Sequence, residues 1–168
     1  MKIIITESQY NRILKEEKEQ KVLSIPSFKF FDNDWDLLQK FLERNGNPPY
    51  SIGGDLDLRE TQIESLGNLK SVGGKLDLEG TPIKSLGNLT SVGGTLKLLY
   101  TSIESLGNLQ SVGGDLNLYD TLIKSLGNLQ SVGGHLLLGG TPLSKMYTRE
   151  QIRQMVNVDG KIYLIYKL

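Results

Sequence analysis

The hydrophobic residues of this chain recur every twenty positions between Ser51 and about Arg149. Each of the five copies begins with serine, an apolar residue and two glycines, and four of them end in Ser-Leu-Gly-Asn-Leu. Six positions of a complete copy are apolar; in the second copy they are Val72, Leu76, Leu78, Ile83, Leu86 and Leu89. One copy cannot bury six apolar side chains by itself, so the pattern predicts stacked copies that share a continuous core.

Within each copy the pattern predicts one main strand and two corners. Leu76 and Leu78 flank a polar residue, which is the period of two expected of a strand with one buried face. The Gly-Gly pair at 73–74 and the Gly-Asn pair at 87–88 lie where the chain must turn, and we expect positive φ there, which glycine and asparagine tolerate. The sequence therefore predicts a solenoid of five to six coils whose strands form a parallel sheet.

Two further columns of the repeat predict contacts between coils. Every copy has threonine at the eleventh position, and we expect these hydroxyl groups to bond the backbone of the next coil. The fourteenth position alternates in charge, so side chains on neighbouring coils should attract one another. The members of the two columns are Thr61, Thr81, Thr101, Thr121 and Thr141, and Glu64, Lys84, Glu104 and Lys124.

The flanking segments carry helix signals. Thr6 and Gln9 fit a capping box, as do Thr148 and Gln151. Between them, a helix with an apolar stripe is expected after the N-cap residue Asp34 and should end at Gly46. We divide the chain into an N-terminal segment with a short helix (1–21), a helical N-terminal cap (22–50), five repeats (51–143) and a C-terminal cap of a short helix and a final strand (144–168).

The phrase Leu-x-Leu-x-x-Thr-x-Ile-x-x-Leu resembles the leucine-rich repeat, with threonine where most such repeats carry asparagine. The phrase Val-Gly-Gly-x-Leu-x-Leu is similar to the repeats of receptor L-domains and their short bacterial and phage relatives. The resemblance covers residues 51–143 and, more weakly, 158–164. It implies a right-handed, leucine-rich-repeat-like solenoid with helical caps, and a binding module that uses the strand face or adjoining loops. Residues 1–14 are also similar to the openings of small phage-encoded proteins.

Composition narrows the functional classes. The formal net charge is zero and no segment is strongly basic, so we expect no nucleic-acid partner. The chain has no cysteine and a single histidine, which leaves no thiolate metal site and no histidine pair for zinc. No apolar run is long enough for a membrane span. We expect a non-enzymatic protein without cofactor or metal, in the cytoplasm of a bacterial or phage-infected cell, with the virion as the alternative location.

One set of carboxylates imitates a calcium loop. Asp32, Asp34, Asp36 and Glu43 occupy positions 1, 3, 5 and 12 of an EF-hand spacing. Leu37 stands at the sixth position, where the sharp turn of such a loop needs glycine. The segment is better interpreted as the start of a helix.

Any specific function must depend on the positions that vary between copies. Positions 5, 7, 9 and 10 are expected on the outer face of the sheet and its exit turn, where the core does not dictate the residue type. The candidate binding residues there are Asp77, Lys97, Leu99, Tyr100, Asn117, Tyr119, His135 and Leu137. Exposed aromatic and apolar residues gathered in one patch often mark a contact site. The alternative is that some of them pack beneath the C-terminal helix.

We therefore expect a protein-interaction module that binds a partner protein through its strand face. Two other classes stay open at this point: a structural component of a phage particle or its assembly, and a glycan-binding surface protein. The oligomeric state does not follow from the sequence.

Overall fold

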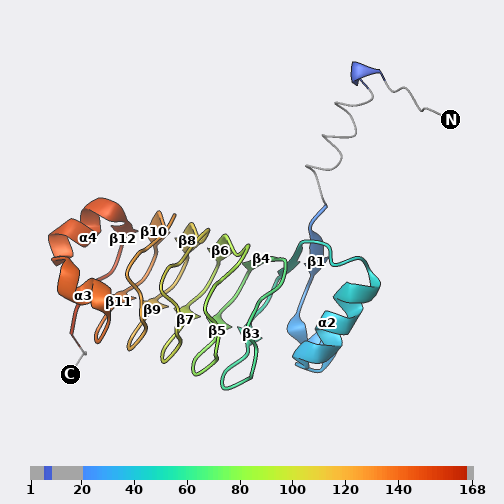
Figure 1. Ribbon diagram of the computed structural model, residues 1–168, viewed down its shortest axis with the longest axis horizontal. Coiled ribbons are helices and arrows are strands. Elements are labelled where there is room, and N and C mark those ends of the chain that lie inside the picture. Colours follow the sequence, from blue (N-terminus) through green and yellow to red (C-terminus); the bar gives the residue numbers. More distant parts are fainter. Residues whose placement is uncertain (1–5, 9–20, 166–168) are drawn as a thin grey trace.

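The computed structural model describes residues 6–8 and 21–165. In this part of the chain the repeats form a parallel β-solenoid, in which successive coils stack along one axis (Figure 1). The predicted repeat solenoid with parallel strands is thereby confirmed. The capping box at Thr6 includes Gln9, which lies outside the described residues.

Each repeat contributes two short strands, one to each of two parallel sheets. The first sheet is built from the Ser-Val segments and has the order β1-β2-β4-β6-β8-β10-β12 among the described residues. Its strands are β1 (Leu23–Ile25), β2 (Tyr50–Ile52), β4 (Leu69–Val72), β6 (Ser91–Val92), β8 (Ser111–Val112), β10 (Ser131–Val132) and β12 (Asn157–Val158). The prediction of one main strand per copy is wrong here, because the Ser-Val segment has a single apolar residue and so displays no period.

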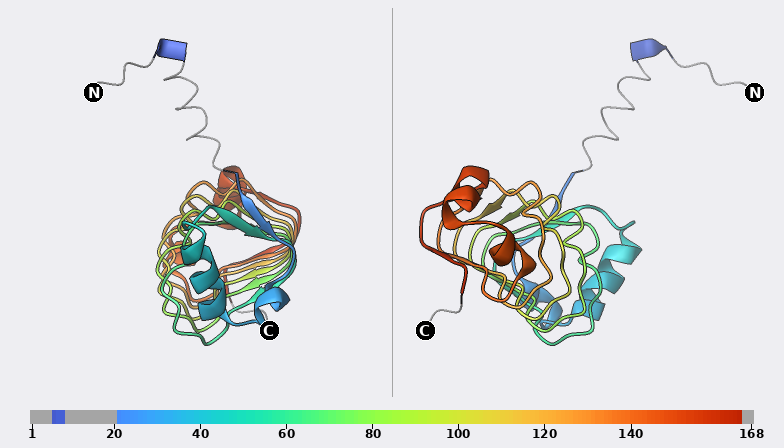
Figure 2. Two further views of the ribbon diagram at one scale, coloured as in Figure 1. Left: turned by 90° about the vertical axis from the view of Figure 1, so that its right-hand side faces the viewer. Right: turned by 60° about the vertical axis from the view of Figure 1, so that its left-hand side comes forward.

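The second sheet is the predicted one, built from the Leu-x-Leu segments. Its order is β13-β11-β9-β7-β5-β3. The strands are β3 (Leu56–Asp57), β5 (Leu76–Asp77), β7 (Leu96–Lys97), β9 (Leu116–Asn117), β11 (Leu136–Leu137) and β13 (Ile162–Tyr163). Viewed along the axis, the two sheets converge at one side of the solenoid, where the Gly-Gly corner joins them (Figure 2).

The Gly-Gly corner needs glycine for a different reason from the one predicted. Neither Gly73 nor Gly74 has positive φ, so the expectation of positive φ at this corner is wrong. A Cβ atom on Gly73 would instead collide with the carbonyl oxygen of Gly53 in the preceding coil. Close stacking of the coils, at about 4.8 Å per strand, therefore excludes side chains here. At the other corner Gly87 has φ of 58°, as expected.

The six apolar columns form one continuous core, as predicted. In the second copy all six side chains are at most 2% exposed. The core extends from Ile25 in β1 to Ile162 in β13. The threonine column lies beside it but bonds differently from the prediction: the hydroxyl of Thr81 donates to the carbonyl of Leu78 in its own coil at 2.8 Å, not to the next coil.

Short helices lie at both ends of the solenoid (Figure 1). They are the 3-10 helix η1 (Phe28–Phe31) and the α-helices α2 (Trp35–Arg44), α3 (Pro142–Met146) and α4 (Arg149–Met155). Asp34 caps α2 by accepting from the Leu37 amide at 3.1 Å, and Gly46 follows the helix with φ of 79°. The capping box of Thr148 and Gln151 opens α4 as predicted.

The helix α3 was not expected from the sequence. It begins with Pro142 directly after Thr141, whose hydroxyl accepts the Ser144 amide at 3.1 Å. Threonine as N-cap followed by proline at the first helical position is a recognised start signal, hidden here because Thr141 also belongs to the threonine column. None of the helices in the described ranges is long and apolar enough to cross a membrane.

Candidate functional site on the outer face of the six-stranded sheet

The strand register brings four of the candidate residues into one row. Asp77 pairs with Lys97, Lys97 with Asn117, and Asn117 with Leu137 across β5, β7, β9 and β11. Tyr163 continues the row on β13. We call the exposed side of this sheet, together with the turns that follow its strands, the strand face. It is charged over the first coils and increasingly apolar over the later ones.

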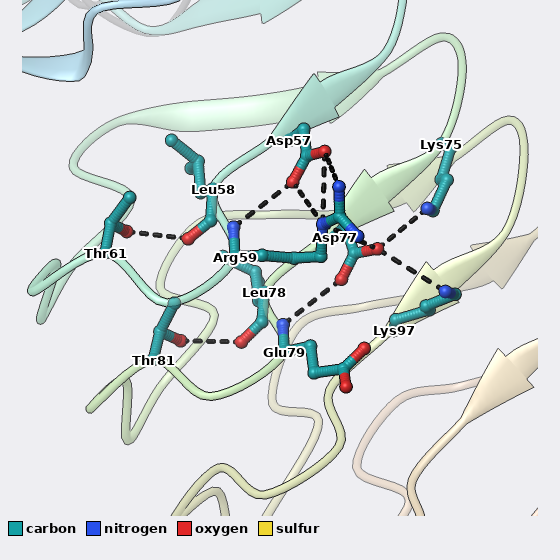
Figure 3. A network of polar contacts seen from close by, with 10 residues as sticks. All are labelled: Asp57, Leu58, Arg59, Thr61, Lys75, Asp77, Leu78, Glu79, Thr81 and Lys97. Atoms are coloured by element: carbon teal, nitrogen blue, oxygen red, sulfur yellow. Dashed lines mark hydrogen bonds and ion pairs between the residues drawn. The ribbon is translucent and has the colours of Figure 1, made fainter.

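At the charged end, three cations surround the carboxylate of Asp77 (Figure 3). Its Oδ2 atom lies 2.7 Å from Nζ of Lys75, 3.6 Å from Nζ of Lys97 and 3.7 Å from Nε of Arg59. The Asp77 side chain is 0% exposed, although it stands on the outer face of the sheet. The aliphatic stems and charged ends of its neighbours cover it, so Asp77 is not directly accessible to a partner.

The ion pairs shift the titration of this cluster. The pKa of Lys75 is raised above its usual value, chiefly by the contact of its ammonium group with the Asp77 carboxylate. The pKa of Asp57 is lowered, chiefly by the hydrogen bond from Arg59, whose Nη2 atom lies 2.7 Å from Oδ2. Both shifts favour the charged forms, so Lys75 and Asp57 stay ionised around neutral pH.

Where position 7 is aspartate or asparagine, its side chain also closes the turn that follows the strand. The Oδ1 atom of Asp77 accepts the Glu79 amide at 3.2 Å, and that of Asn117 accepts the Tyr119 amide at 3.1 Å. Aspartate and asparagine are favoured at such turns because the side chain can bond a backbone group two residues ahead. This local role explains Asp77 and Asn117 without a ligand. The spacing Asx-Leu-x before these turns is the sequence signal for it.

His135 has a structural role at position 5. Its amide donates to Oδ1 of Asp115 at 2.6 Å, and its Nδ1 atom accepts the amide of Lys161 at 2.9 Å. Its ring also meets the ring of Tyr163 edge-on, with centroids 5.7 Å apart. Position 5 thus supplies side-chain acceptors that bond the next coil, and Asp55 does the same for the Lys75 amide at 2.8 Å.

The side chains of Lys97, Leu99, Tyr100 and Leu137 close no turn, although Lys97 contacts the Asp77 carboxylate of the preceding coil at 3.6 Å. Lys97 and Leu137 occupy position 7 without a side-chain acceptor for the turn, and both are partly exposed. Leu99 is partly exposed in the turn after β7, and Tyr100 beside it is 64% exposed. Tyr100 does not lie beneath the C-terminal helices. Tyr119 is half-buried in the corresponding turn of the next coil.

The calcium-loop spacing is not a loop in the structure. Asp36 and Glu43 both lie within α2, with Asp34 as its N-cap. Among the described residues, no group of three or more histidine, cysteine, aspartate or glutamate side chains is arranged to hold a metal ion.

The fold and the strand face define a parallel β-solenoid with a row of variable side chains along one sheet. Comparisons of the chain with protein-family models, with curated proteins and with solved structures found no match.

Proposed function

We propose that this chain is a non-enzymatic protein-interaction module that binds a partner protein through the strand face. Within this proposal the solenoid is leucine-rich-repeat-like and right-handed, with five to six coils and helical caps. The outer face of a parallel sheet is a suitable platform, because the coils hold its side chains at regular spacing on a rigid backbone. The identity of these side chains then determines which protein is bound.

One observation carries the proposal: exposed and partly exposed apolar side chains on the later coils of the strand face that the fold does not require. Leu99 and the exposed Tyr100 follow β7, and Leu137 lies on β11. The side chains of these three residues close no turn, and Lys97 beside them contacts the Asp77 carboxylate. Other copies carry polar, charged or glycine residues at the same positions, so packing accepts other residue types there. Apolar and aromatic side chains clustered beside charged ones are typical of contact surfaces.

The roles of the polar residues support a non-enzymatic function. His135 uses Nδ1 to accept a backbone amide, so that nitrogen is not available as a general base. The Asp77 carboxylate is held by cations and by a turn amide. These side chains are engaged in holding coils together, and their geometry offers no nucleophile paired with a base.

The proposal is tested by quantitative affinity capture with three baits. They are the wild-type chain, the face variant Lys97→Ala/Tyr119→Ala/Leu137→Ala, and a control variant of three exposed residues outside the strand face. The control changes are Gln62→Ala, Lys84→Ala and Ser102→Ala. We expect one protein to be enriched by the wild type and the control and lost with the face variant, while all three baits melt at similar temperatures.

Equal capture of that protein by all three folded baits would exclude the strand face. Absence of any protein enriched by the wild type over an unrelated solenoid bait would oppose an interaction function altogether.

A further inference from the structure

We propose that Tyr100 is the anchor of this interaction, and that it inserts into an apolar socket bordered by basic side chains on the partner. The inference rests on the proposed function and assigns the chemistry of the partner surface. It is drawn from the backbone conformation of Tyr100, from its exposure, and from the charges around it.

The turn after each strand places position 10 in the left-handed region of the backbone. The φ values there are 57° at Glu60, 70° at Gly80, 58° at Tyr100, 55° at Asp120 and 78° at Gly140. Glycine adopts this conformation freely, whereas a bulky side chain such as tyrosine is strained in it. Two copies use glycine, so the turn itself requires no side chain. Tyr100 therefore carries a conformational cost that the fold did not have to accept.

The ring of Tyr100 gives the fold little packing in return. The side chain is 64% exposed. Its contribution to coil stacking comes from the backbone, because its amide donates to the Tyr119 carbonyl at 3.4 Å, as the Gly80 amide donates to Leu99 at 3.0 Å. At the same position the preceding coil has Gly80, which has no side chain to cover the ring. An exposed aromatic residue on strained backbone is the combination expected of a contact residue.

The charges beside Tyr100 indicate what borders the socket. Glu79 lies in the turn of the preceding coil and Asp120 in that of the following coil. The charge of the basic Arg59 is offset by Asp57, whose Oδ2 atom lies 2.7 Å from its Nη2 atom. The turn edge around the ring is therefore acidic. A partner with lysine or arginine around an apolar socket would complement it, and such pairs chiefly speed association and select the partner.

The experiment compares Tyr100→Gly with the matched variant Glu60→Gly. Both replace a strained residue at position 10 by the glycine that other copies use, so both should fold as stably as the wild type. The probe is the purified protein identified by the capture experiment, and its affinity for each full-length variant is measured by titration calorimetry. We expect Tyr100→Gly to lose at least about 30-fold in affinity, as for a hot-spot residue, and Glu60→Gly to lose less than about threefold, as for a residue outside the hot spot.

Two further variants test the chemistry. Tyr100→Phe should bind nearly as well as the wild type, because the socket is apolar. Glu79→Lys should weaken binding, and higher salt should weaken binding of the wild type, because basic groups border the socket. Tighter binding by Glu79→Lys would overturn the basic border.

If a folded Tyr100→Gly variant binds with full affinity, Tyr100 is not the anchor. If the triple face variant has nevertheless lost binding, the proposed function still holds. A wild-type chain that captures no partner would overturn both.

Discussion

Arg153 in α4 donates a hydrogen bond from Nη2 to the carbonyl oxygen of Gly160 at 2.9 Å, in the last coil of the solenoid. Its Nη1 atom donates to the carbonyl of Val158 at 2.8 Å. Inside the solenoid, the carbonyls at these two repeat positions accept amides of the next coil, as Gly74 accepts from Gly94 at 2.9 Å. One guanidinium group therefore replaces the two donors that a further coil would supply.

This relationship predicts that Arg153 protects the open edge of β12. The free energy of unfolding of Arg153→Ala should fall by at most about 1 kcal/mol per hydrogen bond lost, since Arg153 is exposed. The amides of β12 should exchange faster with deuterium, and the chain should self-associate with rising concentration because an uncovered edge can pair with another chain. Hydrogen exchange and analytical ultracentrifugation measure these effects.

The neighbouring exposed residue provides the control for Arg153. Gln154→Ala should change neither exchange nor association. If Arg153→Ala behaves like Gln154→Ala in both measurements, the guanidinium does not protect the edge.

Asp77 is predicted to be the most sensitive residue of the charged cluster. In Asp77→Asn the amide oxygen can still accept the Glu79 amide, but the negative charge among Lys75, Lys97 and Arg59 is lost. Breaking a buried ion pair costs about 3–5 kcal/mol. Because the cations around Asp77 are partly exposed, we expect the free energy of unfolding of Asp77→Asn to fall by about 3 kcal/mol or less. Urea denaturation of the variant checks this prediction.

Asp57→Asn is the matched control for Asp77. It changes the same repeat position, but its side chain is 52% exposed and pairs with Arg59 at the surface. An exposed ion pair contributes about 1 kcal/mol or less. Equal losses in the two variants would show that burial of Asp77 has no energetic consequence.

The Gly-Gly corner gives a prediction about coil stacking. A Cβ atom on Gly94 would lie 2.9 Å from the Gly74 carbonyl carbon and from the Lys75 amide nitrogen, and both belong to backbone that cannot move aside. The free energy of unfolding of Gly94→Ala should therefore be lower than that of the wild type by about 1–3 kcal/mol, the usual range for overpacking. Thermal or urea denaturation measures the loss.

Gly54, at the same position of the first repeat, provides the comparison for Gly94, because no preceding repeat packs against it. At Gly54 the nearest atom to an added Cβ is the Pro26 carbonyl oxygen at 3.8 Å, which is ordinary contact. Gly54→Ala should leave the free energy of unfolding unchanged or raise it by up to about 1 kcal/mol, because alanine lowers the conformational entropy of the unfolded chain. A loss at Gly54 equal to that at Gly94 would contradict the stacking explanation.

The buried phenol of Tyr50 should make the stability of the protein depend on pH in the alkaline range. Burial raises the pKa of its phenol well above the usual value, and the hydroxyl donates to the Leu66 carbonyl at 2.9 Å. Above about pH 10 the unfolded phenol ionises while the folded one keeps its proton. The unfolded state then binds fewer protons, so stability is complete below that pH and falls as the pH rises above it.

Tyr50→Phe isolates this contribution. At neutral pH the variant should lose about 1–3 kcal/mol because the buried Leu66 carbonyl loses its donor. The difference between wild type and variant should shrink as the pH rises above about 10, the usual tyrosine pKa. Urea denaturation over a pH series measures it, and a difference that stays constant would refute the assignment.

The sequence by itself determined the solenoid, its core and the starts of α2 and α4. The six apolar columns repeat with a fixed period, and only stacked coils can bury them, so the continuous core could be read without coordinates. Asp34 and the Thr148–Gln151 pair were also predictable, because a helix cap depends on residues within one turn of each other.

The tertiary structure decided what depends on neighbours twenty residues away. The Ser-Val strands are held by bonds to adjacent coils and show no period of their own. Asp77 is buried because cations from three coils converge on it, and Arg153 bonds the last coil because α4 lies against that end. The strain at Tyr100 is likewise set by a turn geometry that its own sequence does not favour. The location of the strand face was predictable from the repeat. The accessibility of its individual residues to a partner was not.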